Sequence, residues 1–225
     1  MKFNYMVQKI EDQYKALDEN PKQENIYFLH FARSERELKY EEILKKHWGT
    51  HFRNCRILEI GAGGGDNLLF FHRLGFLWHN LYANELLNER VRILKERLKD
   101  STIISGNALD MNFEHFFDIV FQSAVFTSIL DPGFKRELAK KMMQMVKEDG
   151  LILWYDFKYN NPYNKDVKGV TKREIRELFR EANNISFHHV TLAPPIGRKI
   201  KRLYNLINFL FPFLRTHLIA VIKLK

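Results

Sequence analysis

The sequence predicts an α/β protein with a doubly wound, mostly parallel sheet. Two observations carry this prediction. Short apolar runs of strand character alternate with segments of helical length along most of the chain. A glycine cluster at 61–65 directly follows the first strand and precedes a helix. In such sheets ligands bind outside the carboxyl ends of the strands, so the glycine cluster marks the expected binding edge.

The strands of this sheet are expected at short apolar runs bounded by turn residues. These runs are residues 56–60, 81–83, 102–104, 117–121, 151–155, 185–192 and 217–224. Helical spacing of apolar residues predicts helices between the strands, at 67–74, 88–98, 132–146 and 171–181. Gly150 is expected to end the helix that begins at Pro132, because glycine commonly follows the last helical turn.

Capping-box motifs predict where two further helices begin. Ser34 is followed three residues later by Glu37, and Thr171 by Glu174. In this motif each side chain accepts a hydrogen bond from a backbone N–H that is free at the helix start. We therefore expect one helix from Ser34 to about residue 46 and another from Thr171.

The composition is that of an ordinary globular protein. The chain has 225 residues, of which 45% are hydrophobic and 28% charged, and this excludes a disordered or fibrous chain. Cys55 is the only cysteine, so an intrachain disulfide and a cysteine metal cluster are excluded. The histidines lack the paired spacing of metal ligands, so no metal site is expected. We expect no signal peptide or membrane-spanning helix, and a cytoplasmic location.

The positive charge is concentrated in the last third of the chain. Residues 158–225 contain 14 Lys and Arg but only 4 Asp and Glu, a net charge of +10, whereas the whole chain has +9. This region can attract phosphates, nucleic acid or an anionic membrane surface, or simply form a solvated basic face.

The glycine cluster differs from a dinucleotide-binding loop. It has the spacing Gly-x-Gly-x-Gly, and Glu59 stands two residues before it. The dinucleotide fingerprint would require a glycine where this chain has Asp66, which argues against a pyrophosphate ligand. Glu85 follows the end of the second strand, where a carboxylate can accept hydrogen bonds from both hydroxyls of a ribose.

These motifs together resemble those of class I S-adenosylmethionine-dependent methyltransferases. Glu59 to Gly65 resembles their first motif, and Leu81 to Glu85 resembles their second. Ser105 to Ala108 is similar to the motif at the adenine edge, with Asn107 in place of the usual aspartate. The matching stretches that follow are Phe117 to Ser123 and Asp149 to Leu153.

The resemblance implies a Rossmann-like sheet of seven strands, with the last strand antiparallel beside the fifth, and S-adenosyl-L-methionine as the cofactor. Glu59 and the glycines would shape its methionine side, Glu85 would bind the ribose, and Gln122 would lie near the sulfonium. The cofactor-binding positions implied are Glu59, Gly61, Ala62, Gly63, Gly65, Asn67, Glu85, Leu86, Asn107, Ala108, Gln122 and Ser123.

The candidate catalytic residues are His217 and Asp156. Transfer to a hydroxyl oxygen benefits from a general base, commonly histidine or a carboxylate. Asp156 follows the fifth strand, and His217 begins an antiparallel seventh strand, so both are expected at the active edge. The stretches Tyr155 to Asn164, Val167 to Val170 and Pro212 to His217 together resemble a bacterial group of small methyltransferases that often accompany polysaccharide or natural-product biosynthesis. We therefore expect a small-molecule or glycan acceptor, with methylation at oxygen.

Residues 1–225 are expected to form one methyltransferase domain. It would comprise a helical cap at 1–50, a cofactor-binding core at 51–157 and an acceptor-side region at 158–225. A lid helix is expected at about 196–211, and the basic and apolar segment 196–214 could contact a membrane or a lipid-linked, phosphorylated acceptor. The N-terminal residues expected to cover the cofactor from the other side include Tyr5, Tyr14, Tyr27, Phe28 and Arg33.

Other functions remain open at this point. The basic last third would also suit an RNA methyltransferase, although no RNA-binding module is recognisable and nucleic acid is not the expected partner. A non-catalytic cofactor-binding protein is a third alternative, against which the intact glycine loop argues. A dinucleotide-dependent oxidoreductase is a fourth.

Overall fold

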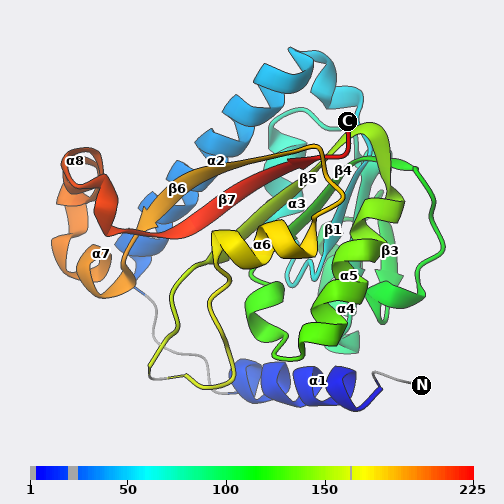
Figure 1. Ribbon diagram of the computed structural model, residues 1–225, viewed down its shortest axis with the longest axis horizontal. Helices are drawn as coiled ribbons and strands as arrows, with labels where there is room; N and C mark the ends of the chain where they lie inside the picture. The colour runs from blue at the N-terminus through cyan, green and yellow to red at the C-terminus, as the bar shows by residue number, and fades with distance from the viewer. Residues whose placement is uncertain (1–3, 20–24, 163) are drawn as a thin grey trace.

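The computed structural model describes residues 4–19, 25–162 and 164–225, and within them shows a seven-stranded sheet with helices on both faces (Figure 1). The strand order is β3-β2-β1-β4-β5-β7-β6, and β7 runs antiparallel to both of its neighbours while the other pairs are parallel. The strands are β1 (Ile57–Ile60), β2 (Leu81–Glu85), β3 (Thr102–Ser105), β4 (Phe117–Ser123), β5 (Val146–Phe157), β6 (Asn184–Leu192) and β7 (Arg215–Lys223). The predicted fold class is confirmed.

Each face of the sheet is covered by its own hydrophobic core. Side chains of a strand alternate between the faces, so Ile57 packs with α2, α3 and α4 while the adjacent Leu58 packs with α5 and α6. The α-helices are α1 (Asn4–Glu19), α2 (Ile26–Trp48), α3 (Asp66–Arg73), α4 (Asn88–Arg97), α5 (Pro132–Met145), α6 (Lys172–Leu178), α7 (Pro194–Ile200) and α8 (Tyr204–Leu210).

One capping-box prediction is wrong and the other is confirmed. α2 begins at Ile26, where the side chain of Asn25 accepts a hydrogen bond from the Phe28 N–H at 3.1 Å, so Ser34 lies inside the helix. The earlier start buries Phe28 against Tyr204. Thr171 does cap α6, because its Oγ1 accepts from the Glu174 N–H at 3.2 Å.

The expected end of α5 at Gly150 is also wrong. The helix ends at Met145, and β5 begins directly at Val146, which pairs with Phe117. Gly150 lies inside β5, after a register shift relative to β4. A Cβ there would lie 2.6 Å from the backbone oxygen of Asp118, so the close approach of the two strands requires glycine.

The segment expected to form one lid helix contains two short helices instead. α7 ends at Ile200, Lys201 has a positive φ of 45°, and a 3-10 turn leads into α8. This segment lies against the first half of α2 (Figure 1). Tyr204 is buried there beside Phe28 and Phe31. In the part of the chain that the structure describes, no helix has the length and apolar character needed to cross a membrane.

Candidate functional site

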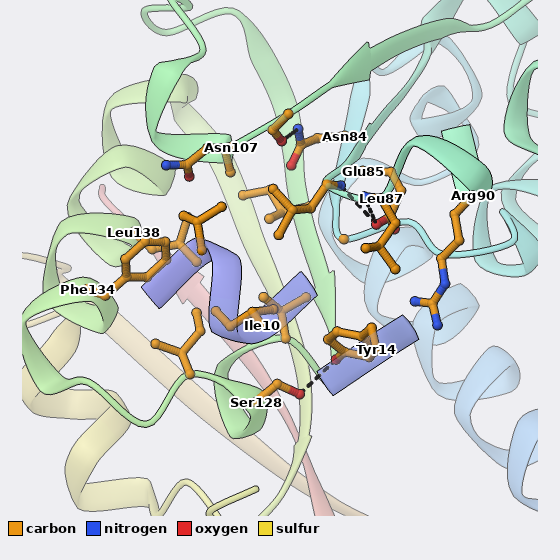
Figure 2. Close-up of a pocket in the computed structure, with 18 of the residues that line it drawn as sticks. Ile10, Tyr14, Asn84, Glu85, Leu87, Arg90, Asn107, Ser128, Phe134 and Leu138 are labelled. Atoms are coloured by element: carbon orange, nitrogen blue, oxygen red, sulfur yellow. Dashed lines mark hydrogen bonds between the residues drawn. The ribbon is translucent and has the colours of Figure 1, made fainter. Parts of the chain in front are cut away.

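A pocket lies at the carboxyl ends of β1, β2 and β4, and α1 covers it (Figure 2). Among the cofactor positions expected from the sequence, those that line it are Gly61, Glu85, Leu86, Asn107, Ala108 and Ser123. The other lining residues are Val7, Ile10, Tyr14, Ile60, Asn84, Leu87, Arg90, Gly106, Val125, Ser128, Ile129, Phe134 and Leu138.

The glycine loop needs its glycines for both conformation and space. Gly61, Gly63 and Gly65 have positive φ values of 66°, 55° and 83°. A Cβ on Gly61 would lie 2.6 Å from the side chain of Val125, and one on Gly65 would lie 2.9 Å from that of Leu94. At Gly63 a Cβ would meet nothing within 4 Å, so the open space beside this residue is available to a ligand. The Ala62 N–H donates to the Asn84 carbonyl at 2.9 Å and fixes the loop against β2.

The carboxylate of Glu85 joins the glycine loop to the end of β2. Its Oε1 accepts from the backbone N–H groups of Leu86 at 2.8 Å and Leu87 at 3.0 Å, and its Oε2 accepts from that of Gly63 at 2.7 Å. The side chain is buried. These bonds hold a negatively charged acceptor at the pocket wall, where ribose hydroxyls could donate to it.

Asn107 and two apolar side chains of α5 line the same side of the pocket (Figure 2). The Asn107 side chain caps the turn at 108–110, accepting from the Leu109 N–H at 3.0 Å. Asn84 donates to the carbonyls of Ile104 and Gly106 and so fixes the same loop. Phe134 and Leu138, four residues apart on α5, form the apolar wall. Sequence reasoning missed these residues, although a polar residue inside an apolar strand was a usable signal at Asn84.

Helix α1 forms the cover of the pocket. The sequence prediction had N-terminal residues covering the cofactor. Val7, Ile10 and Tyr14 line the pocket, and the hydroxyls of Tyr14 and Ser128 are hydrogen bonded at 2.7 Å (Figure 2). The guanidinium of Arg90 lies 4.8 Å from the centre of the Tyr14 ring. Of the residues expected to cover the cofactor, Tyr14 lines the pocket, whereas Tyr5, Tyr27, Phe28 and Arg33 are absent from its described lining.

A group of incompletely bonded polar side chains lies next to the glycine loop, between β1 and α2. Glu59 is buried; its Oε1 accepts from Asn67 at 2.6 Å, while its Oε2 has no partner among the described residues. Arg36 donates to the Asn67 Oδ1 at 3.3 Å, and its buried Nε likewise lacks a partner in the described part of the chain. Burial raises the pKa of the Glu59 carboxyl to about 8. Sequence reasoning missed Arg36.

This arrangement suits a ligand that carries both an ammonium and a carboxylate group. The free oxygen of Glu59 can accept from an ammonium group, and the free Nε of Arg36 can donate to a carboxylate. Buried polar atoms normally have partners, so atoms without one in a protein interior call for an explanation such as a missing ligand. The donor and acceptor types therefore fit the amino-acid end of the cofactor that the sequence resemblance implies.

Comparison with known proteins identifies the central segment. Residues 58–154, somewhat less than half of the chain, match the family model described as a methyltransferase domain. This segment is a methyltransferase domain. No curated protein shows a significant sequence match to the chain.

Solved structures of methyltransferases are similar in fold to most of the chain. The 1,6-didemethyltoxoflavin-N1-methyltransferase of Burkholderia thailandensis, solved with 1,6-didemethyltoxoflavin and S-adenosylhomocysteine, is 16% identical, with a TM-score of 0.66 over 97% of this chain and 88% of that one. A SAM-dependent methyltransferase of Archaeoglobus fulgidus is 15% identical, with a TM-score of 0.58 over 88% and 99%. Phosphoethanolamine N-methyltransferase 2 of Haemonchus contortus, in complex with S-adenosylmethionine, is 15% identical, with a TM-score of 0.60 over 83% and 53%.

The prediction of a methyltransferase that uses S-adenosylmethionine is confirmed by these comparisons.

Within the methyltransferase domain, Gln122 is buried, and both the oxygen and the nitrogen of its side-chain amide are bonded to the backbone. Its Oε1 accepts from the Val125 N–H at 2.9 Å, and its Nε2 donates to the Tyr155 carbonyl at 3.3 Å. Gln122 thus holds the loop after β4, and the neighbouring Ser123 faces the pocket.

The candidate catalytic residues of the methyltransferase lie on opposite faces of the sheet. His217 stacks on Tyr155 with ring centres 5.3 Å apart, whereas Asp156 is the next residue of β5 and points the other way. Neither residue belongs to the described lining of the pocket. The structure therefore does not bring them together as a catalytic pair.

Burial shifts both of these groups toward their neutral forms. It raises the pKa of Asp156 to about 7. The Asp156 Oδ2 accepts from the Thr127 N–H at 3.3 Å, and its Oδ1 has no partner among the described residues. Burial, aided by the charge of Arg36, lowers the pKa of His217 to about 4. Asp156 can therefore exchange a proton near neutral pH, whereas His217 stays neutral there.

Proposed function

We propose that this methyltransferase transfers a methyl group to a hydroxyl oxygen of a small-molecule or glycan acceptor. The observation that carries the proposal is the arrangement around the glycine loop. Glu85 and Gly61 line the pocket, and the Glu85 carboxylate accepts from the Gly63 N–H. Glu59 and Arg36, each with an unpartnered buried atom, are bonded to Asn67 in the helix that follows the loop. When bound, S-adenosylmethionine supplies a methyl group on a positively charged sulfur. The protein then has to hold the donor and acceptor in line and keep water out.

The side chains divide this binding task. Glu59 accepts from the ammonium of the cofactor, Arg36 donates to its carboxylate, and Glu85 accepts from the ribose hydroxyls. Asn107 contacts the edge of the adenine, whose faces lie between apolar side chains of the pocket. Ala62, Gly63 and Gly65 support these contacts through the backbone of the glycine loop. The Leu86 N–H donates to Glu85, and the side-chain amide of Asn67 donates to Glu59.

We propose Asp156 as the general base on the acceptor side. A carboxyl with a pKa near 7 is ionised in part at physiological pH and can accept the proton of a hydroxyl as the methyl group is transferred. His217 is the weaker candidate, because a group with a pKa of about 4 is a poor base. Two of the three neighbours, the enzymes of Burkholderia thailandensis and Haemonchus contortus, are described as acting on small molecules, which supports an acceptor of that size. The bacterial biosynthetic subtype and a cytoplasmic location belong to the same proposal.

Calorimetric titration tests the binding part of the proposal. Wild-type protein is titrated with S-adenosylhomocysteine, with 5′-methylthioadenosine, which lacks the amino-acid end, and with NADH. We expect R36M and E59Q to bind S-adenosylhomocysteine more weakly while their affinity for 5′-methylthioadenosine is unchanged. The control K46M changes an exposed cation near the other end of the same helix and should behave as wild type. Binding of NADH alone, or equal losses for both ligands, would overturn the assignment.

Methyl transfer to candidate acceptors then tests the reaction. Labelled S-adenosylmethionine is offered with hydroxyl-bearing glycans, phenols, amines and mixed RNA, and the methylated atom is determined by mass spectrometry. Transfer to a hydroxyl supports the proposal. Transfer to nitrogen or to RNA contradicts the proposed acceptor while leaving the cofactor site intact.

A further inference from the structure

The surface formed by α7, α8 and the turn after them is both apolar and cationic. Its exposed apolar side chains include Phe209 and Phe213, which are 79% and 74% exposed. The others are Leu203, Leu206, Leu210 and Phe211. Exposed cations stand directly before them in the chain: Arg198, Lys199, Lys201 and Arg202. We call these ten residues the α7–α8 surface.

No acidic residue offsets this charge in the surrounding sequence. Glu181 is the last acidic residue of the chain, and residues 182–225 contain seven Lys and Arg. A solvated face on a soluble protein usually mixes both signs and exposes few large apolar side chains together. The α7–α8 surface carries positive charge only and exposes several large apolar side chains together, which marks it as a contact surface.

The side chains on the inner side hold the α7–α8 surface in place. The Tyr204 hydroxyl donates to the Glu35 Oε2 at 2.9 Å and accepts from the Leu192 N–H at 3.1 Å. Arg215 donates from Nε to the Asn208 Oδ1 at 2.8 Å. Phe31 stacks on Tyr204 with ring centres 5.7 Å apart. Because these contacts bind the inner side to α2, β6 and β7, Phe209 and Leu206 are held outward.

The start of α2 extends the same surface. The Asn25 side chain donates to the Arg198 carbonyl at 3.0 Å, which places Ile26 and Tyr27 beside α7. These two side chains are also exposed. Figure 1 shows α7 and α8 together beyond the end of β6, next to the first turns of α2. β6 is parallel to β5, so this end of β6 lies at the same edge of the sheet as the pocket.

We propose that the α7–α8 surface docks the protein on an anionic lipid bilayer. Exposed aromatic and aliphatic side chains can enter the interface between headgroups and acyl chains, while the adjoining Lys and Arg side chains pair with lipid phosphates. A second copy of the chain is a poor occupant, because a symmetric contact would bring the same cations together and none of the ten residues of the surface is acidic. The proposal concerns binding alone and does not depend on the proposed reaction.

Vesicle co-sedimentation tests the docking surface. Full-length protein is mixed with phosphatidylcholine vesicles that contain or lack phosphatidylglycerol. We expect binding only with phosphatidylglycerol, and weaker binding as salt is raised. K199Q/K201Q/R202Q should lower the partition coefficient about a hundredfold, from roughly fivefold per cation. F209S/F213S should lower it about tenfold.

Matched controls change the same residue types on other faces. K95Q/K99Q/R136Q removes three exposed cations, and L77S/I93S removes two exposed apolar side chains. Both should bind vesicles as wild type does. All variants should keep their affinity for S-adenosylhomocysteine, which shows that they are folded and separates this test from that of the proposed function.

Three outcomes would overturn the proposal. One is wild-type protein that binds no vesicles, and another is an equal loss of binding in the control variants. The third is a dimer, seen by light scattering, that F209S/F213S dissociates while neither protein binds lipid.

Discussion

Replacement of Glu59 by glutamine is expected to stabilise the ligand-free protein and to weaken cofactor binding. Burial raises the pKa of the Glu59 carboxyl from 4.5 to about 8. Between these pH values the folded protein holds a proton that the unfolded chain has lost, so the free energy of unfolding falls as the pH rises. Glutamine ionises in neither state, so E59Q avoids this loss.

The magnitude follows from the shift. At pH 7 the unfolded carboxyl is 2.5 pH units (7 − 4.5) above its ordinary pKa. At 1.36 kcal/mol per unit this costs the wild-type protein about 3 kcal/mol. E59Q should therefore raise the free energy of unfolding by about 3 kcal/mol at pH 7 and by less than about 1 kcal/mol at pH 5. The amide oxygen of glutamine can still accept the hydrogen bond from Asn67.

Urea unfolding at pH 5, 6, 7 and 8 measures this effect, with the exposed E89Q as the control. The affinity for S-adenosylhomocysteine at pH 7 should fall about 10- to 150-fold, because a hydrogen bond to a charged group contributes about 1.5–3 kcal/mol. A gain in stability together with a loss of affinity distinguishes a binding carboxylate from a structural one. If wild type and E59Q show the same dependence of stability on pH, Glu59 is ionised in the ligand-free protein and the reasoning is refuted.

The remaining predictions concern the loop, the base and the cover. G63V should abolish cofactor binding in calorimetry, because its side chain would fill the open space beside Gly63, and retained affinity would contradict the assignment. D156N should lower kcat about 10²- to 10⁴-fold with KM unchanged. In the wild type, kcat should rise as the pH passes about 7, where the Asp156 carboxylate forms, and D156N should lack this rise. A pH profile that is the same in both proteins would exclude Asp156 as the base. Y14F should weaken the docking of α1 by about 1 kcal/mol and speed hydrogen exchange in α1, and S128A should have the same effect. The double variant should lose no more than either single variant, and additive effects would contradict a shared hydrogen bond.

The parts of the site predicted from the sequence are those defined by short-range patterns. The glycine loop and Glu85 lie at the ends of β1 and β2, and apolar runs locate both strands. Parallel pairing then places Glu85 beside the loop, where its carboxylate meets the Gly63 N–H. Periodicity and glycine spacing are sufficient for this step because each depends on residues close together in the chain.

Arg36 could not be predicted in the same way, because its role depends on a contact across the fold. It lies 31 positions before Asn67, on a helix whose start the capping box misplaced. Ser34 and Glu37 satisfy the local rule, yet the packing of Phe28 against Tyr204 extends the helix back to Ile26. A capping motif describes what a free helix end would prefer, and tertiary burial overrides that preference.

The sequence also could not show which segment covers the pocket. Both α1 and the α7–α8 segment combine apolar with polar residues, and periodicity alone does not say which of them reaches the pocket. Val7, Ile10 and Tyr14 have the spacing of one helical face, and this face lines the pocket. The described residues of α7 and α8 instead bury Tyr204 and Gly197 against α2 and leave Leu206, Phe209 and Leu210 exposed.

The unpartnered carboxyl oxygens in the interior link ligand binding to folding stability. Glu59 and Asp156 are buried carboxyls whose raised pKa values destabilise the ligand-free protein as the pH rises. A bound ligand that supplies an ammonium group to Glu59 would reverse that effect, so ligand binding and folding stability are linked at this residue. α1 lines the pocket through Val7, Ile10 and Tyr14, and its polar contacts with the rest of the fold include the Tyr14–Ser128 bond and a bond from Gln13 to the Asp166 carbonyl at 3.2 Å. A ligand bound in the pocket should therefore stabilise both the buried core and the docking of α1 on it.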